Sequence, residues 1–395
     1  MNRREFLLGS AAAGALRGAE RQPNIILILA DDLGYGDLGC YGQQQIRTPN
    51  LDRMAQEGLR FTQAYSGSTV CAPSRCCLMT GMHNGHGRLR DNLPHGLSLR
   101  PEDVTAAEVL NRGGYRTGAF GKWHLGDSGT PGIPTLKGFD EFFGYRSGDH
   151  AHFYYPQTIW DNDSEIILDG NRGGARKQYA PDLFLDKALS FIERHKQRPF
   201  FLYMPTIIPH WSDYPADSPR SQEVPSDAPY TDRPWPQVEK NYAAAVTRLD
   251  GQAGKILEAL RTAGIEENTI LLFASDNGPS AEKLHSPGFF KSTPFRGVKR
   301  DVYDGGIRIP LLARWPGRIR PGQVTAHPCA FWDFLPTAAE LANVAPPAGI
   351  DGISFAPTLL GRPQKQHDYF YWDYGHVRDK FLQAVRVEDW KGVRN

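Results

Sequence analysis

The sequence predicts an α/β fold, an α/β/α sandwich in which helices cover both faces of a large, mostly parallel sheet. Continuous apolar runs at 24–30, 199–204 and 269–274 are typical of strands buried on both faces. Segments with helical patterns lie between these runs, and each run is followed by polar residues that could serve a site. Alternating strands and helices favour a parallel sheet.

Length and composition restrict the class of protein. The 395 residues carry 45 Lys and Arg against 44 Asp and Glu, a formal net charge of +1. This balance lacks the basic excess of a dedicated nucleic-acid binder, so we expect no nucleic-acid partner. The 40% hydrophobic and 23% charged residues exclude wholesale disorder. Five cysteines are too few, and odd in number, for a disulfide scaffold.

The first twenty residues predict an export signal. Arg3 and Arg4 precede Phe6 and Leu7, and a mildly apolar stretch follows at 9–16. This order resembles a bacterial twin-arginine signal, and the stretch is shorter than the roughly 20 residues of a membrane span. The alternative is a frayed helix with two solvated arginines. We therefore expect export by the twin-arginine machinery to the periplasm or cell envelope, and no stable membrane span.

The remaining elements follow in chain order. Residues 21–325 are predicted to form one large α/β domain, and residues 326–395 a small C-terminal α+β subdomain with strands at 369–372 and 384–387. Six prolines in 212–236 indicate a long ordered loop, either functional or a simple surface insertion. Further strands are expected at 115–120 and 309–315, and helices at 50–57, 103–112, 182–195 and 238–262.

Polar side chains follow four of the predicted strands, and ligands bind beyond the carboxyl ends of strands in open α/β sheets. These side chains are Asp31, Asp32, Lys122, His124, His210, Asp276 and Asn277. Asp31, Asp32, Asp276 and Asn277 offer only oxygen ligands, which suit calcium or magnesium. Taken alone, paired aspartates could equally be turn or helix-cap residues.

Cys71 opens the string Cys71-Ala72-Pro73-Ser74-Arg75. Because Pro73 suits the first turn of a helix, Cys71 is expected at a helix N-terminus, where the dipole favours an anion. The alternative is a small buried apolar residue.

Cys-x-Pro-Ser-Arg followed by Leu-x-Thr-Gly resembles the signature of the type I, formylglycine-dependent sulfatases. These arylsulfatase-like enzymes belong to the alkaline phosphatase superfamily. The resemblance covers residues 23 to about 361 and implies an alkaline-phosphatase-like sandwich. Its other motifs lie at 23–37, 121–126, 137–144, 275–279, 296–299 and 303–310, where Asp304 replaces the family's usual glutamate.

The resemblance implies a hydrolase of sulfate esters. Cys71 would be converted to formylglycine by a maturation enzyme, in the cytoplasm before export. One hydroxyl of the hydrated aldehyde would attack sulfur and release the alcohol, and the second would help to expel sulfate. Calcium would be held by Asp31, Asp32, Asp276 and Asn277 and would touch the modified Cys71.

The resemblance also implies roles for the remaining polar residues. Arg75 would stabilise the oxyanion of the nucleophile, while Lys122 and Lys299 would clamp sulfate oxygens. His210 would protonate the leaving oxygen, and His124 would deprotonate the second hydroxyl. Singly, each histidine could be a core residue and each lysine a solvated one. A polar residue of the sulfate pocket falls at Ser147, with Asp149 and His150 as alternatives.

An aromatic and histidine-rich stretch is the candidate for substrate selection. His150, His152, Phe153, Tyr154, Tyr155 and Trp160, together with Trp211, could form a carbohydrate subsite, or could simply pack in the core. By resemblance to exported bacterial sulfatases, a sulfated sugar is favoured over an aryl sulfate. Alternatives are a phosphodiesterase or phosphonate monoester hydrolase of the same superfamily, and an inactive binding protein.

The family continues beyond 389–391, so we expect an incomplete subdomain with an exposed sheet edge.

Overall fold

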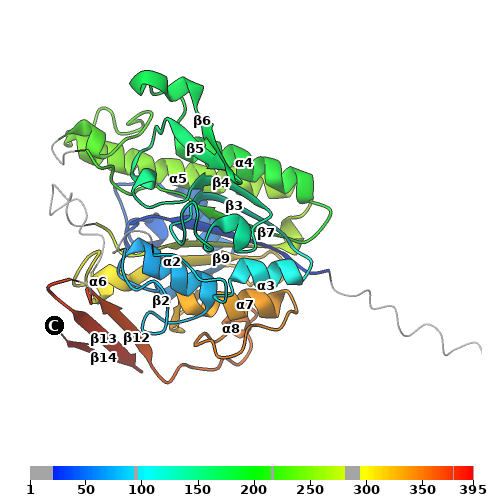
Figure 1. Ribbon diagram of the computed structural model, residues 1–395. Helices are drawn as coiled ribbons and strands as arrows, with labels where there is room; N and C mark the ends of the chain where they lie inside the picture. The colour runs from blue at the N-terminus through cyan, green and yellow to red at the C-terminus, as the bar shows by residue number, and fades with distance from the viewer. Residues whose placement is uncertain (1–20, 93–96, 215–217, 281–293, 377, 395) are drawn as a thin grey trace, which may run out of the picture.

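The computed structural model describes residues 21–92, 97–214, 218–280, 294–376 and 378–394 (Figure 1). An eleven-stranded sheet lies at the centre, in the order β10-β2-β9-β8-β1-β7-β3-β4-β5-β6, with β11 beside β2. Its middle is parallel and consists of β8 (Thr269–Ser275), β1 (Asn24–Ala30), β7 (Phe200–Pro205), β3 (Arg116–Lys122) and β4 (Glu141–Tyr145). The predicted α/β class with a mostly parallel sheet is confirmed.

Strand β1 lies in the middle of this parallel part. Ile28 faces Met204 of β7 on one side and Phe273 of β8 on the other. Every residue of these three strands is buried, as continuous apolar runs predict. Strand β3 extends two residues beyond its predicted end, so Lys122 is the last strand residue rather than part of the following loop.

The sheet becomes mixed on one side, where β10 and β11 pair in parallel with β2, and antiparallel on the other, at β4, β5 and β6. Strand β9 (Arg308–Arg314) lies between β8 and β2 (Leu59–Tyr65) and is antiparallel to both. The sequence predicts β9 but neither its direction nor β2. At the edges lie β5 (Thr158–Asp161), β6 (Ser164–Ile167), β10 (Gln323–Thr325) and β11 (Cys329–Ala330).

Helices cover both faces of the sheet, which confirms the predicted sandwich (Figure 1). One face carries α1 (Pro49–Gln56), α4 (Ala180–His195) and α5 (Gln237–Thr262). The other carries α2 (Cys71–Thr80), α3 (Ala106–Arg112), α7 (Phe334–Leu341) and α8 (Ala356–Leu359), while α6 (Asp304–Ile307) is a single turn before β9. Helix α3 starts three residues later than predicted because Thr105 and Glu108 form a capping box.

Short 3-10 turns complete the connections. They are η1 (Gly39–Tyr41), η2 (Pro134–Leu136), η3 (His150–His152), η4 (Asp169–Gly174), η5 (Pro219–Ser221), η6 (Glu266–Asn268) and η7 (Phe331–Asp333). Turn η5 is the regular element of the described part of the proline-rich segment 212–236.

A second, three-stranded antiparallel sheet follows, with β12 (Phe370–Tyr374), β13 (Leu382–Val387) and β14 (Trp390–Arg394). Its buried face packs Trp372 against Tyr65 and Trp332. Lys391 Nζ lies 2.7 Å from Asp304 Oδ1. The domain boundary at 325 and the incomplete terminus stay predictions, and residues 1–20 lie outside the described residues. No helix in the described part is long and apolar enough to cross a bilayer.

Candidate active site

The candidate site lies where the parallel strands end. Asp31 and Asp32 follow β1, and Asp276 and Asn277 follow β8. The strands stay aligned past their ends, because Asp31 N–H donates to Ile208 O and Asp276 N–H to Ala30 O, both at 3.0 Å. All four polar side chains are buried. The structure therefore brings together the oxygen ligands that the sequence places at separate strand ends.

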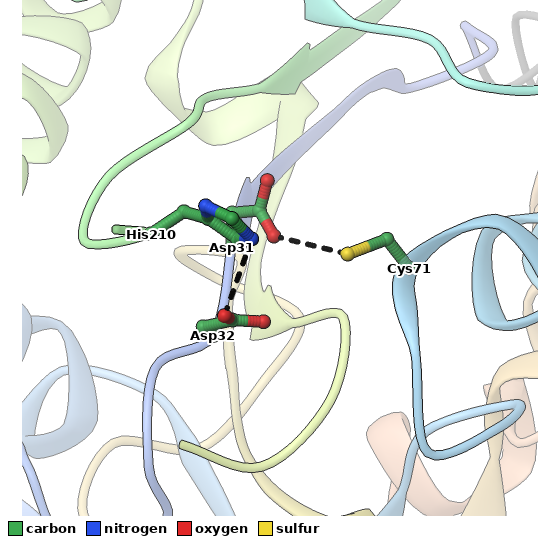
Figure 2. A group of neighbouring side chains, drawn as sticks. All are labelled: Asp31, Asp32, Cys71 and His210. Carbon is green, nitrogen blue, oxygen red and sulfur yellow. Dashed lines mark hydrogen bonds and ion pairs between the residues drawn. The ribbon is translucent and has the colours of Figure 1, made fainter. Parts of the chain in front are cut away.

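Cys71 is the first residue of α2 and is 1% exposed. Its Sγ lies 3.5 Å from Asp31 Oδ1 and 3.6 Å from Lys299 Nζ. Figure 2 shows the thiol pointing at the Asp31 carboxylate, with Asp32 and His210 close by. Burial, and then the Asp31 charge, raise the pKa of the Cys71 thiol to about 12. Unmodified Cys71 is therefore a neutral thiol at neutral pH.

The first turn of α2 is anchored to the strand ends. Ser74 Oγ donates to Asp276 O at 2.5 Å and accepts from Gly67 N–H at 3.0 Å. Ala72 N–H donates to Asn92 Oδ1 at 3.0 Å, which satisfies one of the unpaired amides of a helix start. The motif residues thus fix the position of Cys71 relative to the carboxylates.

Arg75 lies one helical turn after Cys71 and is completely buried. Its Nε and Nη2 donate to Asp276 Oδ2 at 3.1 and 2.8 Å, and its Nη1 donates to Lys122 O at 2.6 Å. Nη2 also lies 3.4 Å from Asp31 Oδ2. The guanidinium therefore orients two carboxylates and the end of β3, a fixed geometry for which arginine is well suited.

Two lysines place their amino groups beside the aspartates. Lys122 Nζ lies 2.8 Å from Asp31 Oδ2, and Lys299 Nζ lies 2.7 Å from the Asp32 carboxylate. Burial opposes ionisation of Asp31, but the positive charges of Lys122, Arg75 and Lys299 hold the pKa of this carboxyl well below its usual range. Burial likewise opposes the charge on Lys299, and Asp32 raises the pKa of the amine.

His210 has a defined tautomer. Its Nδ1 lies 2.5 Å from Trp211 O, so Nδ1 carries a proton that it donates to this carbonyl. Its Nε2 then accepts from Lys299 Nζ at 3.1 Å and lies 3.4 Å from Asp32. Burial, and then the Lys299 charge, lower the pKa of His210 well below its usual value. The imidazole is therefore neutral in this state, and its Nε2 faces the site.

His124 adopts a left-handed backbone conformation with φ of 62°, and Asp32 does so with φ of 64°. A Cβ added to Gly148 would lie 2.3 Å from the His124 ring, so only glycine allows this close approach. The ring Nδ1 is buried without a hydrogen-bond partner. Burial, and then Lys122, lower the pKa of His124. Left-handed non-glycine residues are uncommon and often lie at functional sites.

A cavity of about 180 Å³ reaches the start of α2, where Ala72 lines it. His124, Ser147 and Asp149 line it, together with Asn92 and Arg146. Asn92 and Arg146 were not predicted from the sequence. Asn92 lies in no periodic element, and Arg146 follows a strand that was not predicted. Arg146 also lies over the Trp160 ring, 4.0 Å from its centroid.

The predicted aromatic subsite is largely taken up by packing. Trp211 is 4% exposed and stacks on Tyr242, and His150 packs edge-on against Tyr145. His152 stacks on His210, with ring centroids 4.5 Å apart, and its Nδ1 lies 2.9 Å from Asp213. The structure therefore brings His152 to His210, whereas His150, His152 and Trp211 are not among the cavity-lining residues.

The residues at the strand ends fit a hard cation. Asn277 Oδ1 is fully buried and has no hydrogen-bond partner. Burial, and then the nearby Asp31 charge, raise the pKa of Asp276, so negative charge at this point is under-compensated. Asp31, Asp32, Cys71 and His210 also offer one ligand atom each within 4.8 Å of one another (Figure 2). A divalent cation would relieve this crowding and satisfy the free amide oxygen.

Carboxylates, Arg75 and two lysines thus gather around Cys71 at the carboxyl edge of a mostly parallel sheet, the arrangement expected of an enzyme that acts on an anionic substrate. The Sulfatase family model matches residues 23–344, and the N-sulphoglucosamine sulphohydrolase C-terminal model matches residues 297–394. The chain belongs to the sulfatase family and is an arylsulfatase-like hydrolase of sulfate esters.

Arylsulfatase A of Homo sapiens is 37% identical over 98% of this chain and 77% of its own length. N-acetylgalactosamine-6-sulfatase of Canis lupus familiaris is 34% identical, over 98% of this chain and 74% of its own. The crystal structure of Ps i-CgsB in complex with k-i-k-neocarrahexaose has a TM-score of 0.81 and 29% identity, and covers 95% of this chain and 84% of that one.

Proposed function

We propose that this protein hydrolyses a sulfate ester of a sugar, with Cys71 as the precursor of formylglycine and calcium as the bound metal. The observation that carries the proposal is the position of Cys71, whose Sγ lies between Asp31 and Lys299 at the start of α2. Formylglycine supplies two hydroxyl groups on one carbon when hydrated, and calcium supplies Lewis acidity. Asp31, Asp32, Asp276 and Asn277 would hold the calcium.

The burial of Cys71 bears on its conversion. With 1% of the residue exposed, a maturation enzyme cannot reach the thiol in the folded chain. Conversion would therefore precede the completion of folding. Because the twin-arginine route carries folded proteins, conversion would also take place in the cytoplasm before export to the periplasm or cell envelope.

Lys122 and Lys299 would stabilise the negative charge that develops on the sulfate group. Their amino groups are fixed by Asp31 and Asp32, so they need no reorganisation when the charge develops. Arg75 faces the carboxylates rather than Sγ, so its role would be to position Asp276 and Asp31. This differs in emphasis from the oxyanion role that the resemblance implies.

His210 would act as general acid and His124 as base. To protonate a leaving oxygen, His210 must carry a second proton on Nε2, and Lys299 opposes this charge in the free protein. A bound sulfate ester brings negative charge to the same place, which favours the protonated ring. His124 is held neutral by burial, as a base requires.

A sugar substrate is supported by the cavity that Ala72 and His124 line. Asn92, Arg146, Ser147 and Asp149 contribute polar groups to its wall, and these suit a hydroxyl-rich ligand. One similar structure is described as a complex with k-i-k-neocarrahexaose, and one relative as an N-acetylgalactosamine-6-sulfatase.

Two measurements test the proposal. Mass spectrometry of the peptide that contains Cys71 should detect an aldehyde in place of the thiol in active protein. Turnover should then be compared for matched sulfate and phosphate monoesters and diesters, each with a sugar and an aryl leaving group. The sugar sulfate should be hydrolysed fastest. Unmodified thiol in fully active protein, or faster hydrolysis of a phosphodiester, would overturn the proposal.

A further inference from the structure

We infer that His83, His86 and Asp351 form a binding site for a divalent transition metal such as Zn²⁺, at the C-terminal end of α2. This inference is independent of the proposed function. Each residue offers one ligand atom, and these three atoms lie within 4.8 Å of one another. Two imidazoles and one carboxylate suit zinc, nickel or copper rather than calcium, because nitrogen donors prefer these softer ions.

A tight turn brings the two histidines together. Helix α2 ends at Gly81, which has a φ of 72°, and the turn that follows contains His83 and His86. His83 O accepts from the N–H of His86 and of Gly87, both at 2.9 Å. The imidazole rings stack, with centroids 4.1 Å apart and planes 24° apart, so the exposed His86 ring would turn about its side-chain bonds to aim its lone pair at an ion held by His83.

Asp351 is fixed against the same turn. Its N–H and that of Gly352 donate to Gly81 O at 3.0 and 3.1 Å. Its Oδ2 accepts from the His83 N–H at 2.9 Å, and both carboxylate oxygens lie 3.0 to 3.1 Å from His86 Nδ1. Backbone contacts that orient a carboxylate in this way are typical of the surroundings of a metal ligand.

The His83 ring has an unsatisfied atom that points to a missing partner. His83 is 7% exposed, yet its Nε2 has no hydrogen-bond partner. Asp351 Oδ1 lies 3.9 Å from this atom, beyond hydrogen-bond reach. A simple ion pair between His86 and Asp351 leaves this nitrogen unexplained, whereas a metal between the three side chains uses it. Buried polar atoms without partners are rare enough to need such an explanation.

Metal binding has a defined proton balance. Gly85 N–H donates to His83 Nδ1 at 3.0 Å, so the ring proton lies on Nε2 when no metal is bound. Binding of His83 through Nε2 moves this proton to Nδ1 by exchange with water and releases the partly exposed Gly85 N–H to solvent. Binding of His86 through Nδ1 would likewise move the proton that faces Asp351 to Nε2, so no net proton is lost from either ring. The His86 side chain is 54% exposed, which gives an ion and its remaining water ligands access to the site.

The bound ion would join three parts of the chain. Asn84, inside the turn, donates to Asp373 O and Oδ1 at 2.7 and 2.6 Å, which ties the turn to β12. Asp351 belongs to the loop between α7 and α8. Zinc would therefore connect the end of α2, this loop and the C-terminal sheet, and should raise the thermal unfolding midpoint.

The test is a calorimetric titration of the tag-free, calcium-saturated full chain with ZnCl₂, after removal of transition metals. We expect one equivalent of zinc to bind. His86→Ala and Asp351→Asn should weaken binding at least tenfold, whereas His376→Ala, at an exposed histidine outside the cluster, should leave it unchanged. The Cys71→Ala protein should still bind this equivalent, which separates it from zinc at the candidate active site.

Co²⁺ offers a second measurement, because its visible absorption reports nitrogen and oxygen ligation directly. The wild-type band should be lost in His86→Ala, a surface substitution that is compatible with folding. Absence of zinc binding to the wild-type chain would overturn the inference. So would equal affinity of the wild-type chain and His86→Ala.

Discussion

The two ends of α2 place different chemistry about 15 Å apart, the length of a ten-residue helix. At its N-terminus, Cys71 lies among buried carboxylates and the cations of Arg75, Lys122 and Lys299. Beyond its C-terminus lie two imidazoles and one carboxylate, of which only the His86 ring is exposed. The first end combines hard oxygen donors with positive charge and suits an anionic substrate and calcium. The second suits a softer ion and no substrate. Ligand type, more than proximity of charge, therefore distinguishes the two sites.

The largest expected effect is at the N-terminal end. Cys71→Ala should reduce turnover of a sulfate ester by on the order of 10⁴-fold or more, the scale of loss when an activated nucleophile is removed. Cys76→Ala is the matched control, since Cys76 is equally buried on the same helix but packs in the core. It should retain activity and lose only some stability. Equal losses in both variants would show that packing of α2, rather than Cys71, matters.

The next effect concerns the positive charge beside Cys71. Lys299→Met should lower kcat/KM by about 10²- to 10³-fold, the range for a group that stabilises charge only in the transition state. Lys137→Met serves as control, because Lys137 is also buried but donates to Pro101 O and Asp103 O, outside the site. Stability should fall in this control, while the specific activity of the folded fraction stays unchanged. An active Lys299→Met protein would contradict the proposed sulfate clamp.

Removal of metal should separate the two ends. Chelation should abolish sulfate ester hydrolysis, and calcium alone should restore it, because the strand-end ligands are oxygen atoms. His86→Ala should lose and regain activity in the same way as the wild-type chain. Restoration by zinc without calcium, measured in initial-rate assays, would contradict the assignment of a hard cation to the N-terminal end.

The smallest effect is at the C-terminal end. His86→Ala should change kcat/KM by less than about twofold, since the side chain touches none of the residues around Cys71. Zinc should raise the thermal midpoint of the wild-type chain by a few degrees, the scale of a modest linked binding energy in a protein of this size, and that of His86→Ala by less. Differential scanning calorimetry with and without ZnCl₂ measures both values.

The parallel part of the sheet could be predicted because its strands are buried on both faces. The run Ile25-Ile26-Leu27-Ile28-Leu29 has no other ready interpretation. Strand β2 was missed because it contains Arg60, Thr62 and Gln63, and its burial pattern is mixed around a bulge. The spacing of apolar residues does not predict a strand whose pairing in the sheet depends on tertiary contacts.

The site was predictable only where one strand end or one motif carried the information. Asp31 and Asp276 follow apolar runs, but the contact of Arg75 with Asp276 joins residues 201 positions apart. The contact between His86 and Asp351, which are 265 positions apart, could not be predicted from the local sequence either. Such contacts depend on how α2 packs against the sheet and against α7. The periodicity of apolar residues in the sequence does not specify this packing.

The left-handed backbone conformations of Asp32 and His124 lower the thermal stability of the protein, while the side chains they position belong to the candidate active site. Each non-glycine residue in this region carries a backbone cost of roughly 1 kcal/mol, which asparagine or glycine largely avoids. His124→Asn should therefore be an inactive protein that survives heating better than the active one. Selection of random variants for survival at high temperature alone would favour such substitutions, and would erode catalysis at the residues on which it depends most.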